Sequence, residues 1–188
     1  VNNYCASGLT AIGQAAAMVA AGQATRVLAG GVEMMSRVPF MADNADYYSD
    51  ASYDRRTRYI PVALAADRLA EDIGVTRDEL DRAALVSQQR TAAAEGTALV
   101  ASRIALTGLK REECARPATT LEALAAMAPA FAGLADQYRD ALGGRAIDHR
   151  HTVGHAPPMS DGAGLALVGA EGAGVKPRAR IVAWAEAG

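Results

Sequence analysis

The chain has 188 residues, of which 51% are hydrophobic and 21% are charged, and its formal net charge is −2. This is the composition of an ordinary globular chain that is long enough to bury one core. The near-neutral charge gives no electrostatic basis for binding nucleic acid. The longest apolar stretch, residues 15–21, is far shorter than the ~18 residues that span a bilayer. We therefore expect neither a nucleic-acid partner nor a membrane segment.

The two cysteines, Cys5 and Cys114, are far apart in the sequence. This spacing does not suggest a disulfide framework, so a reducing compartment, the cytoplasm, is expected. No basic segment followed by an apolar one marks a secretion signal. Since the chain starts at Val1 in a stretch that looks internal to a fold, we expect an internal piece of a longer protein.

The first part of the chain predicts a strand–helix–strand order, which is typical of a layered α/β fold. Residues 8–21 have apolar side chains at helical spacing and end at Gly22, which predicts a largely buried helix. Residues 26–29 predict a short strand, and Gly30 and Gly31 are expected to break it.

The middle of the chain, residues 38–147, predicts a mostly helical inserted subdomain. Residues 42–59 are polar and aperiodic, which predicts a long loop. Thr76 and Glu79 form a capping box, and Thr120 is expected to cap a short helix. Helices are predicted over 62–72, from 77 to about 95, and over 121–127. Further on, 162–169 predicts a buried strand and 179–185 predicts another.

Cys5 lies where the first extended segment meets the helix predicted at 8–21. Free N–H groups and the helix dipole favour a thiolate there, and the thiolate is the nucleophilic form. Ala6, Ser7 and Gly8 are small, so a substrate could approach the sulfur, and a nearby N–H could stabilise an oxyanion. A buried structural cysteine is the alternative, and these residues alone leave the two interpretations about equal.

Four separated motifs occur in order: NYCASGLTAI at 3–12, AGGVEMMSRVPF at 29–40, ARPATTLEAL at 115–124 and HTVGHAPPMSDGAGLALV at 151–168. Together they resemble the thiolase family, in which a nucleophile motif precedes a glycine pair and a Glu-x-Met-Ser motif. The last residues, KPRARIVAWAEAG, resemble the junction with that family's second half.

The resemblance implies part of a thiolase-like layered α/β fold and a role in fatty-acid metabolism. The implied activity is acyl exchange between coenzyme A and a 3-ketoacyl-CoA, as thiolysis or Claisen condensation. Cys5 matches the cysteine that carries the acyl-thioester intermediate. Coenzyme A or acyl-CoA would be a substrate, not a permanently bound cofactor, and a homodimer or homotetramer is expected for the complete protein. The family's general base and second cysteine lie in the second half, so residues 1–188 alone are expected to be inactive.

The resemblance also implies how the chain is divided. We expect the N-terminal core at 1–37, the inserted subdomain at 38–147, a return to the core at 148–175 and the start of a C-terminal domain at 176–188.

Three further residues match positions that contact coenzyme A in the family. Arg116 matches an arginine at the nucleotide, and a guanidinium suits a phosphate or an adenine face. Val62 follows Pro61 where the family often has a His-Met pair along the pantetheine tunnel. Pro157 replaces a serine that touches pantetheine. For Arg116 the alternative is an exposed loop arginine.

Three histidines, His149, His151 and His155, lie in one stretch of the chain. A polar loop is preferred over a metal site, because no helix or strand register fixes such ligands. His155 matches a family asparagine, which makes it the one local candidate for a catalytic base. Cys114 matches no family role and is expected to be an ordinary thiol.

Two alternatives to a thiolase remain open. A ketoacyl synthase resembles it in fold and nucleophile but uses two histidines and a carrier-bound malonyl group. A non-catalytic thiolase-like protein that binds acyl-CoA or a lipid is the other, since His155 and Pro157 depart from the family pattern.

Overall fold

The computed structural model describes residues 1–39, 41–48, 50–109 and 112–186 of the chain. Contacts divide it into two compact units, one made of residues 1–40 and 159–188 and the other of residues 41–158. The domain boundaries expected from the sequence stay a prediction; by contacts, residues 148–158 lie in the second unit. Among the described helices, none is long and apolar enough to cross a membrane.

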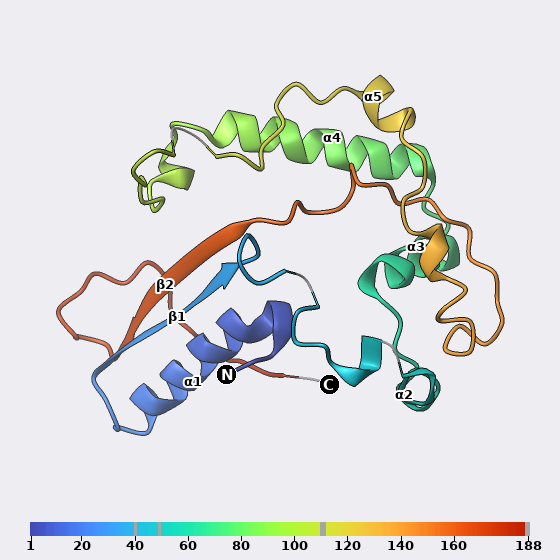
Figure 1. Ribbon diagram of the computed structural model, residues 1–188. Helices are drawn as coiled ribbons and strands as arrows, with labels where there is room; N and C mark the ends of the chain where they lie inside the picture. Colours follow the sequence, from blue (N-terminus) through green and yellow to red (C-terminus); the bar gives the residue numbers. More distant parts are fainter. Residues whose placement is uncertain (40, 49, 110–111, 187–188) are drawn as a thin grey trace. The chain divides into compact units, whose positions relative to one another are not determined.

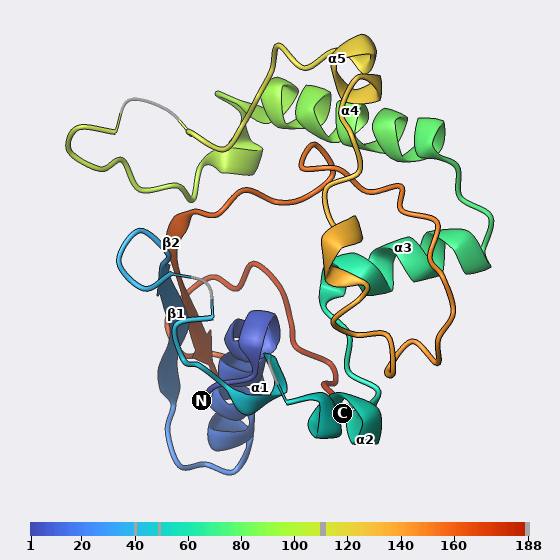
Figure 2. The ribbon, with the colours of Figure 1, turned by 45° about the vertical axis from the view of Figure 1, so that its right-hand side comes forward.

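The first unit combines one helix with a pair of antiparallel strands (Figure 1). A 3-10 turn η1 (Tyr4–Ala6) leads into α1 (Ser7–Ala20), where a helix was expected. Strand β1 (Arg26–Met34) pairs with β2 (Asp161–Gly169) along its whole length. Figures 1 and 2 show α1 lying along the paired strands, which it contacts directly.

The expectation that Gly30 and Gly31 break the first strand is wrong. Both glycines belong to β1 and pair with Leu165 and Gly164 of β2. A Cβ at position 30 would lie 2.3 Å from the carbonyl oxygen of Gly164, so the missing side chain lets the strands approach closely here. The glycine pair therefore extends the ladder.

The strand predicted at 179–185 is also wrong, because the structure gives residues 179–186 no regular secondary structure. This segment packs on α1 instead of joining the strands. The ring of Trp184 lies against Gly13, where a Cβ would be 2.6 Å from its Cδ2 atom, and Glu186 hydrogen-bonds to Thr10. Helix α1 thus anchors the end of the described chain.

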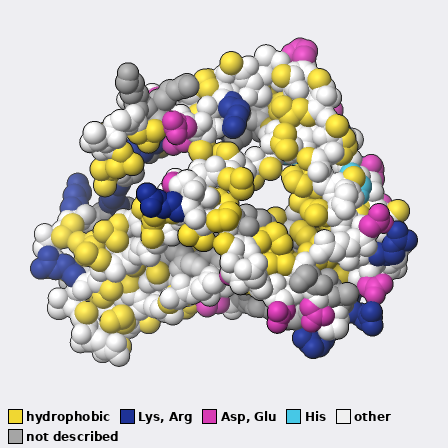
Figure 3. Space-filling view, in the orientation of Figure 1, with side chains coloured by type: hydrophobic (Ala, Val, Ile, Leu, Met, Phe, Trp, Pro, Cys, Tyr) yellow, Lys and Arg dark blue, Asp and Glu magenta, His cyan; other side chains and the backbone are white. Residues whose placement is uncertain are grey.

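Strand β2 confirms the predicted strand at 162–169, but not its burial. Leu165 and Leu167 are 72% and 48% exposed. On β1, Leu28 and Val32 are also exposed. Figure 3 shows hydrophobic side chains spread over this part of the chain, at the lower left. A pair of strands with one helix has too few layers to bury both faces.

The second unit is mostly helical, as predicted. Helix α3 (Val62–Asp72) has the predicted bounds and is followed by Gly74 at a φ of +74°. Helix α4 (Arg77–Ala94) begins with the predicted capping box between Thr76 and Glu79. Helix α5 (Leu121–Ala125) is capped by Thr120, whose side chain accepts a hydrogen bond from the N–H of Ala123.

The loop expected at 42–59 contains a 3-10 turn η2 (Asp46–Tyr48) and a short helix α2 (Ala51–Thr57). The carboxylate of Asp50 accepts a hydrogen bond from the N–H of Ser52 and caps that helix, which ends at Arg58 in the left-handed conformation. The local capping residues outweigh the missing hydrophobic period. Two more 3-10 turns, η3 (Ala98–Val100) and η4 (Ala132–Leu134), complete this unit's described elements.

The contact between Gly13 and Trp184 predicts a cost for any side chain at position 13. Gly13→Ala should lower the free energy of unfolding by about 1–3 kcal/mol, since the new methyl group would overlap the indole ring. Gly8→Ala is the matched control on the same helix, because nothing lies within 4 Å of that position. It should leave stability unchanged or raise it by up to about 1 kcal/mol. Urea unfolding of both variants measures the difference; equal effects would contradict this packing.

Candidate functional site

Cys5 is exposed and lies in the η1 turn, directly before α1. Tyr4 has a φ of 48°, a left-handed conformation that non-glycine residues rarely adopt. Polar contacts stabilise it: the Ser7 hydroxyl donates to the Tyr4 carbonyl at 2.7 Å, and the Tyr4 N–H donates to Asn2 Oδ1 at 3.1 Å. The N–H of Asn3 donates to the Ser7 oxygen at 2.7 Å. A strained turn therefore presents the thiol beside a helix start.

The same turn is tied to the body of the first unit through Thr10. The side-chain amide of Asn3 donates to Thr10 Oγ1 at 3.1 Å, and this buried hydroxyl also hydrogen-bonds to Glu186. The turn that carries Cys5 is thus linked to α1 and to the segment that follows Trp184.

Two of the sequence motifs meet where β1 ends and β2 begins. The N–H of Ser36 donates to Asp161 Oδ1 at 2.8 Å, and its hydroxyl donates to Oδ2 at 2.5 Å. These two hydrogen bonds hold the pKa of Asp161 below its usual value. The serine of the Glu-x-Met-Ser motif therefore closes one end of the ladder.

The other three predicted site residues lie in the second unit, and all are exposed. Val62 is the first residue of α3 and is 83% exposed. Arg116 precedes α5; its N–H donates to Gln88 Oε1 on α4 at 2.8 Å, and its guanidinium donates to the Cys114 carbonyl at 3.2 Å. Pro157 follows the histidine-rich stretch. A depression of about 620 Å³ on α4 contains none of them; it is lined by Arg82, Ala83, Val86, Ser87, Arg90, Thr91 and Ala94.

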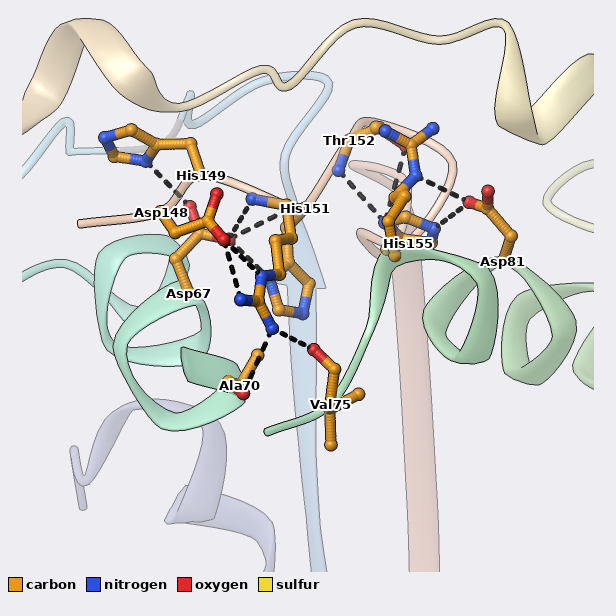
Figure 4. Close-up of polar contacts among 11 residues, drawn as sticks. Asp67, Ala70, Val75, Asp81, Asp148, His149, His151, Thr152 and His155 are labelled. Atoms are coloured by element: carbon orange, nitrogen blue, oxygen red, sulfur yellow. Dashed lines mark hydrogen bonds and ion pairs between the residues drawn. The ribbon is translucent and has the colours of Figure 1, made fainter. Parts of the chain in front are cut away.

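The histidine-rich stretch is held by a buried carboxylate on α3, Asp67 (Figure 4). Its Oδ1 accepts hydrogen bonds from the N–H of Arg150 at 3.0 Å and from the N–H and Nδ1 of His151 at 2.8 and 2.7 Å. Its Oδ2 contacts Nδ1 of His149 at 2.9 Å. Burial raises the pKa of Asp67, but the hydrogen bonds outweigh it, and the pKa lies below its usual value.

Arg150 satisfies carbonyl groups where α3 ends. Its guanidinium contacts the carbonyls of Ala70 and Val75 and pairs with Asp148. The Ala70 carbonyl in the last turn of α3 also accepts from the Val75 N–H, and Val75 lies in the link to α4. This arginine therefore connects the end of α3 with that link.

A second buried carboxylate, Asp81 on α4, holds His155. Nε2 of His155 lies 2.6 Å from Asp81 Oδ1, and Arg77 Nε donates to the same oxygen at 2.9 Å. Burial raises the pKa of Asp81, but Arg77 and His155 outweigh it and hold the pKa below its usual value. The N–H of Thr152 donates to the other ring nitrogen, Nδ1, at 3.0 Å.

The suggestion that His155 is a local catalytic base is therefore wrong. Both of its ring nitrogens are engaged and its side chain is only 5% exposed, so it offers no free nitrogen to a substrate. His149 and His151 also contact a carboxylate. Among the described residues, no group of three or more His, Cys, Asp or Glu side chains could hold a metal ion.

Sequence reasoning missed Asp67, Asp81 and Gln88. One signal for Asp67 was available, because it stands between Leu64 and Ala70 on the buried face of α3, where a charged residue requires partners. Gln88 gave no comparable signal, because a glutamine on a long polar helix such as α4 is usually a residue that faces water.

Comparison with known proteins gives a consistent result. The family model "Thiolase, N-terminal domain" matches residues 1–172. The whole chain is 34% identical to the beta-ketoadipyl-CoA thiolase of Pseudomonas putida, of which it covers 51%. It is 35% identical to a 3-ketoacyl-CoA thiolase of Escherichia coli, of which it covers 49%. The chain thus spans about half the length of the curated relatives it matches.

Solved structures give the same match. The human mitochondrial 3-ketoacyl-CoA thiolase in complex with CoA is 29% identical with a TM-score of 0.70, over 91% of this chain and 44% of that one. The dimeric peroxisomal thiolase of Saccharomyces cerevisiae is 25% identical with a TM-score of 0.70, over 90% of this chain and 42% of that one.

The contacts of Asp67 predict that removing its carboxylate destabilises the fold. Asp67→Ala should lower the free energy of unfolding by about 3 kcal/mol, because the N–H groups of Arg150 and His151 would lose their acceptor in a buried place. Asp78→Ala is the control, since the exposed pair of Asp78 with Arg82 should contribute about 0.5 kcal/mol or less.

The acid dependence of stability gives a second readout for Asp67. Because its folded-state pKa is lowered, its stabilisation is present above the unfolded carboxyl pKa of ~3.9 and is lost as the pH falls through the folded value. Urea unfolding across this range should therefore show a steeper loss in the parent than in Asp67→Ala. Parallel curves would contradict the role of this carboxylate.

Proposed function

The chain belongs to the thiolase family, and from this we propose that it carries the nucleophile half of an acyltransferase that acts on 3-ketoacyl-CoA. The expected fold, part of a thiolase-like α/β structure, is confirmed by the solved structures that it matches. The observation that supports the proposal is the placement of Cys5, exposed in a strained turn before α1. Coenzyme A or acyl-CoA is the proposed substrate, and no permanently bound cofactor is invoked.

The proposed thiolysis uses Cys5 as the acyl carrier. Its thiolate sulfur bonds to the C3 carbonyl carbon of the substrate, the bond between C2 and C3 breaks, and C2 takes up a proton as acetyl-CoA leaves. The sulfur of a second coenzyme A then bonds to the acyl carbon and releases Cys5. A thiolate suits both steps because it attacks and leaves readily. Claisen condensation is the same sequence in reverse.

The general base and the group that exchanges the C2 proton are not assigned to residues 1–188, whose three histidines all contact buried carboxylates. We therefore propose that this chain acts as part of a longer protein and does not turn over alone. A cytoplasmic location and an oligomeric complete protein remain proposals as well.

Arg116, Val62 and Pro157 are proposed contacts for coenzyme A. All three side chains are exposed, so a substrate that binds and leaves could reach them. The hydrogen bond from the Arg116 N–H to Gln88 fixes the backbone of Arg116, from which its side chain extends. A guanidinium there could pair with a phosphate or stack on adenine.

Cys5→Ala in the full-length protein should abolish the acyl-enzyme, because only a thiol at that position can carry the acyl group. Cys114→Ala should leave it intact, since this half-buried cysteine lies in a separate loop of the second unit. Intact-mass and peptide mass spectrometry after mixing with acetoacetyl-CoA locates the adduct. An adduct on Cys114 would overturn the assignment. Binding of coenzyme A with no adduct on the parent protein would support the non-catalytic alternative.

Arg116→Ala should raise the KM for the coenzyme A substrate about tenfold and leave kcat nearly unchanged, because a nucleotide contact acts equally in ground and transition states. Arg139→Ala is the control, since this exposed arginine pairs only locally with Asp136 among the described residues. Steady-state thiolysis by the full-length protein gives both constants. A fall in kcat at constant KM would argue against a nucleotide contact.

A further inference from the structure

The two neighbours of the His155 ring assign its tautomer (Figure 4). The N–H of Thr152 can only donate, so Nδ1 must accept and carries no hydrogen. The hydrogen therefore sits on Nε2, which donates to Asp81 at 2.6 Å. This tautomer follows from the hydrogen-bond network.

The carboxylate of Asp81 connects His155 to two helices. Asp81 belongs to α4 and also accepts from Arg77 one turn earlier. The same guanidinium donates from Nη2 to the carbonyls of Leu124 and Met127, at 2.6 and 3.0 Å, where α5 ends. His155, α4 and α5 are thus joined through one buried oxygen and one arginine.

The backbone before His155 is packed tightly against α5. A Cβ at Gly154 would lie 2.7 Å from Leu124 Cδ2 and 3.0 Å from Met127 Sδ. Thr152 is fully buried, its hydroxyl accepts from the Gly154 N–H at 3.1 Å, and its carbonyl accepts from the His155 N–H at 3.0 Å. Residues 152–155 therefore form a closed turn, and the exposed Pro157 follows two residues later.

We propose that His155 is a positioning residue, which acts through Asp81 and Thr152 to fix the exposed segment that carries Pro157. It is neither an acid nor a base in the reaction. Because Pro157 and the following proline are conformationally restricted, the direction in which the chain leaves His155 sets where they lie. The catalytic consequence rests on the proposed function, whereas the anchoring of the turn does not.

Two substitutions each keep one of the two hydrogen bonds of the His155 ring and remove the other. In His155→Asn, the side-chain oxygen takes the place of Nδ1 and can accept from Thr152, but the side chain is too short to reach Asp81. In His155→Gln, the amide nitrogen takes the place of Nε2 and can donate to Asp81. Neither side chain titrates.

Hydrogen exchange at the Thr152 amide of the full-length protein tests the anchoring. At neutral pH and after correction for intrinsic exchange, His155→Gln should reduce its protection about tenfold relative to the parent, because the acceptor for the Thr152 N–H is lost. His155→Asn should keep the protection, because its side-chain oxygen can accept from Thr152. The amides of Arg150 and His151 are internal controls, because they donate to Asp67, whose lowered pKa keeps it ionised. Thr152 protection in His155→Gln that equals that of the parent would overturn the proposal.

Steady-state kinetics tests the consequence for the substrate. In His155→Gln the loss of the Thr152 contact should raise the KM for the coenzyme A substrate several-fold with kcat nearly unchanged, and His155→Asn should keep KM close to that of the parent. A fall in kcat at constant KM in both variants would overturn the positioning role and indicate proton transfer. If exchange behaves as expected but the parent forms no acyl-enzyme, the proposed function fails while the anchoring of the turn is supported.

Discussion

The second unit depends on two carboxylates that are buried in water-poor surroundings, Asp67 on α3 and Asp81 on α4. A buried carboxylate destabilises a fold unless hydrogen bonds replace the lost water. Here the replacing donors come largely from one short stretch, residues 149–155. This requirement fixes where that stretch can lie, since moving it would leave one or both carboxylates unsatisfied.

The first unit is organised by a different constraint, the close approach of backbones. Gly30 lets β1 and β2 come together, and Gly13 lets the indole of Trp184 rest on α1. Neither contact involves a charge. At the end of the ladder where Met34 pairs with Asp161, Ser36 hydrogen-bonds to the Asp161 carboxylate. These hydrogen bonds join two sequence motifs that lie on either side of most of the second unit.

Local signals in the sequence predicted the helices well. The capping box at Thr76 gave the start of α4, and the bounds predicted for α3 agree with the structure. Apart from α2, which local caps form within the loop expected at 42–59, the failures concern contacts between distant residues. Whether Gly30 breaks or extends a strand depends on its partner in β2, and whether 179–185 forms a strand depends on an available edge. Neither partner can be read from a local window.

The candidate site was predictable only in part, for the same reason. The position of Cys5 before a helix follows from local pattern and family motif. The role of His155 does not, because a histidine in a polar stretch suits a base, a ligand or a hydrogen-bonded anchor equally. Only its partners, Asp81 and Thr152, decide between these, and the first lies on a helix distant in the sequence.

The turns at Cys5 and at His155 also differ in how their geometry is maintained. The turn at Cys5 includes the unfavourable φ of Tyr4, a cost of about 1–3 kcal/mol that the surroundings must offset. Hydrogen bonds do so locally: the Ser7 hydroxyl donates to the Tyr4 carbonyl, Asn2 accepts from the Tyr4 N–H, and Asn3 donates to Ser7. Thr10 links this turn to the end of the described chain. The turn at His155 has no such strain, since its φ values are ordinary, and relies on buried partners instead. A nucleophile needs a fixed thiol that is open to attack, so strain within an exposed turn suits Cys5. A binding loop needs only that the residue from which it starts is fixed, so buried His155 followed by exposed Pro157 suits that role.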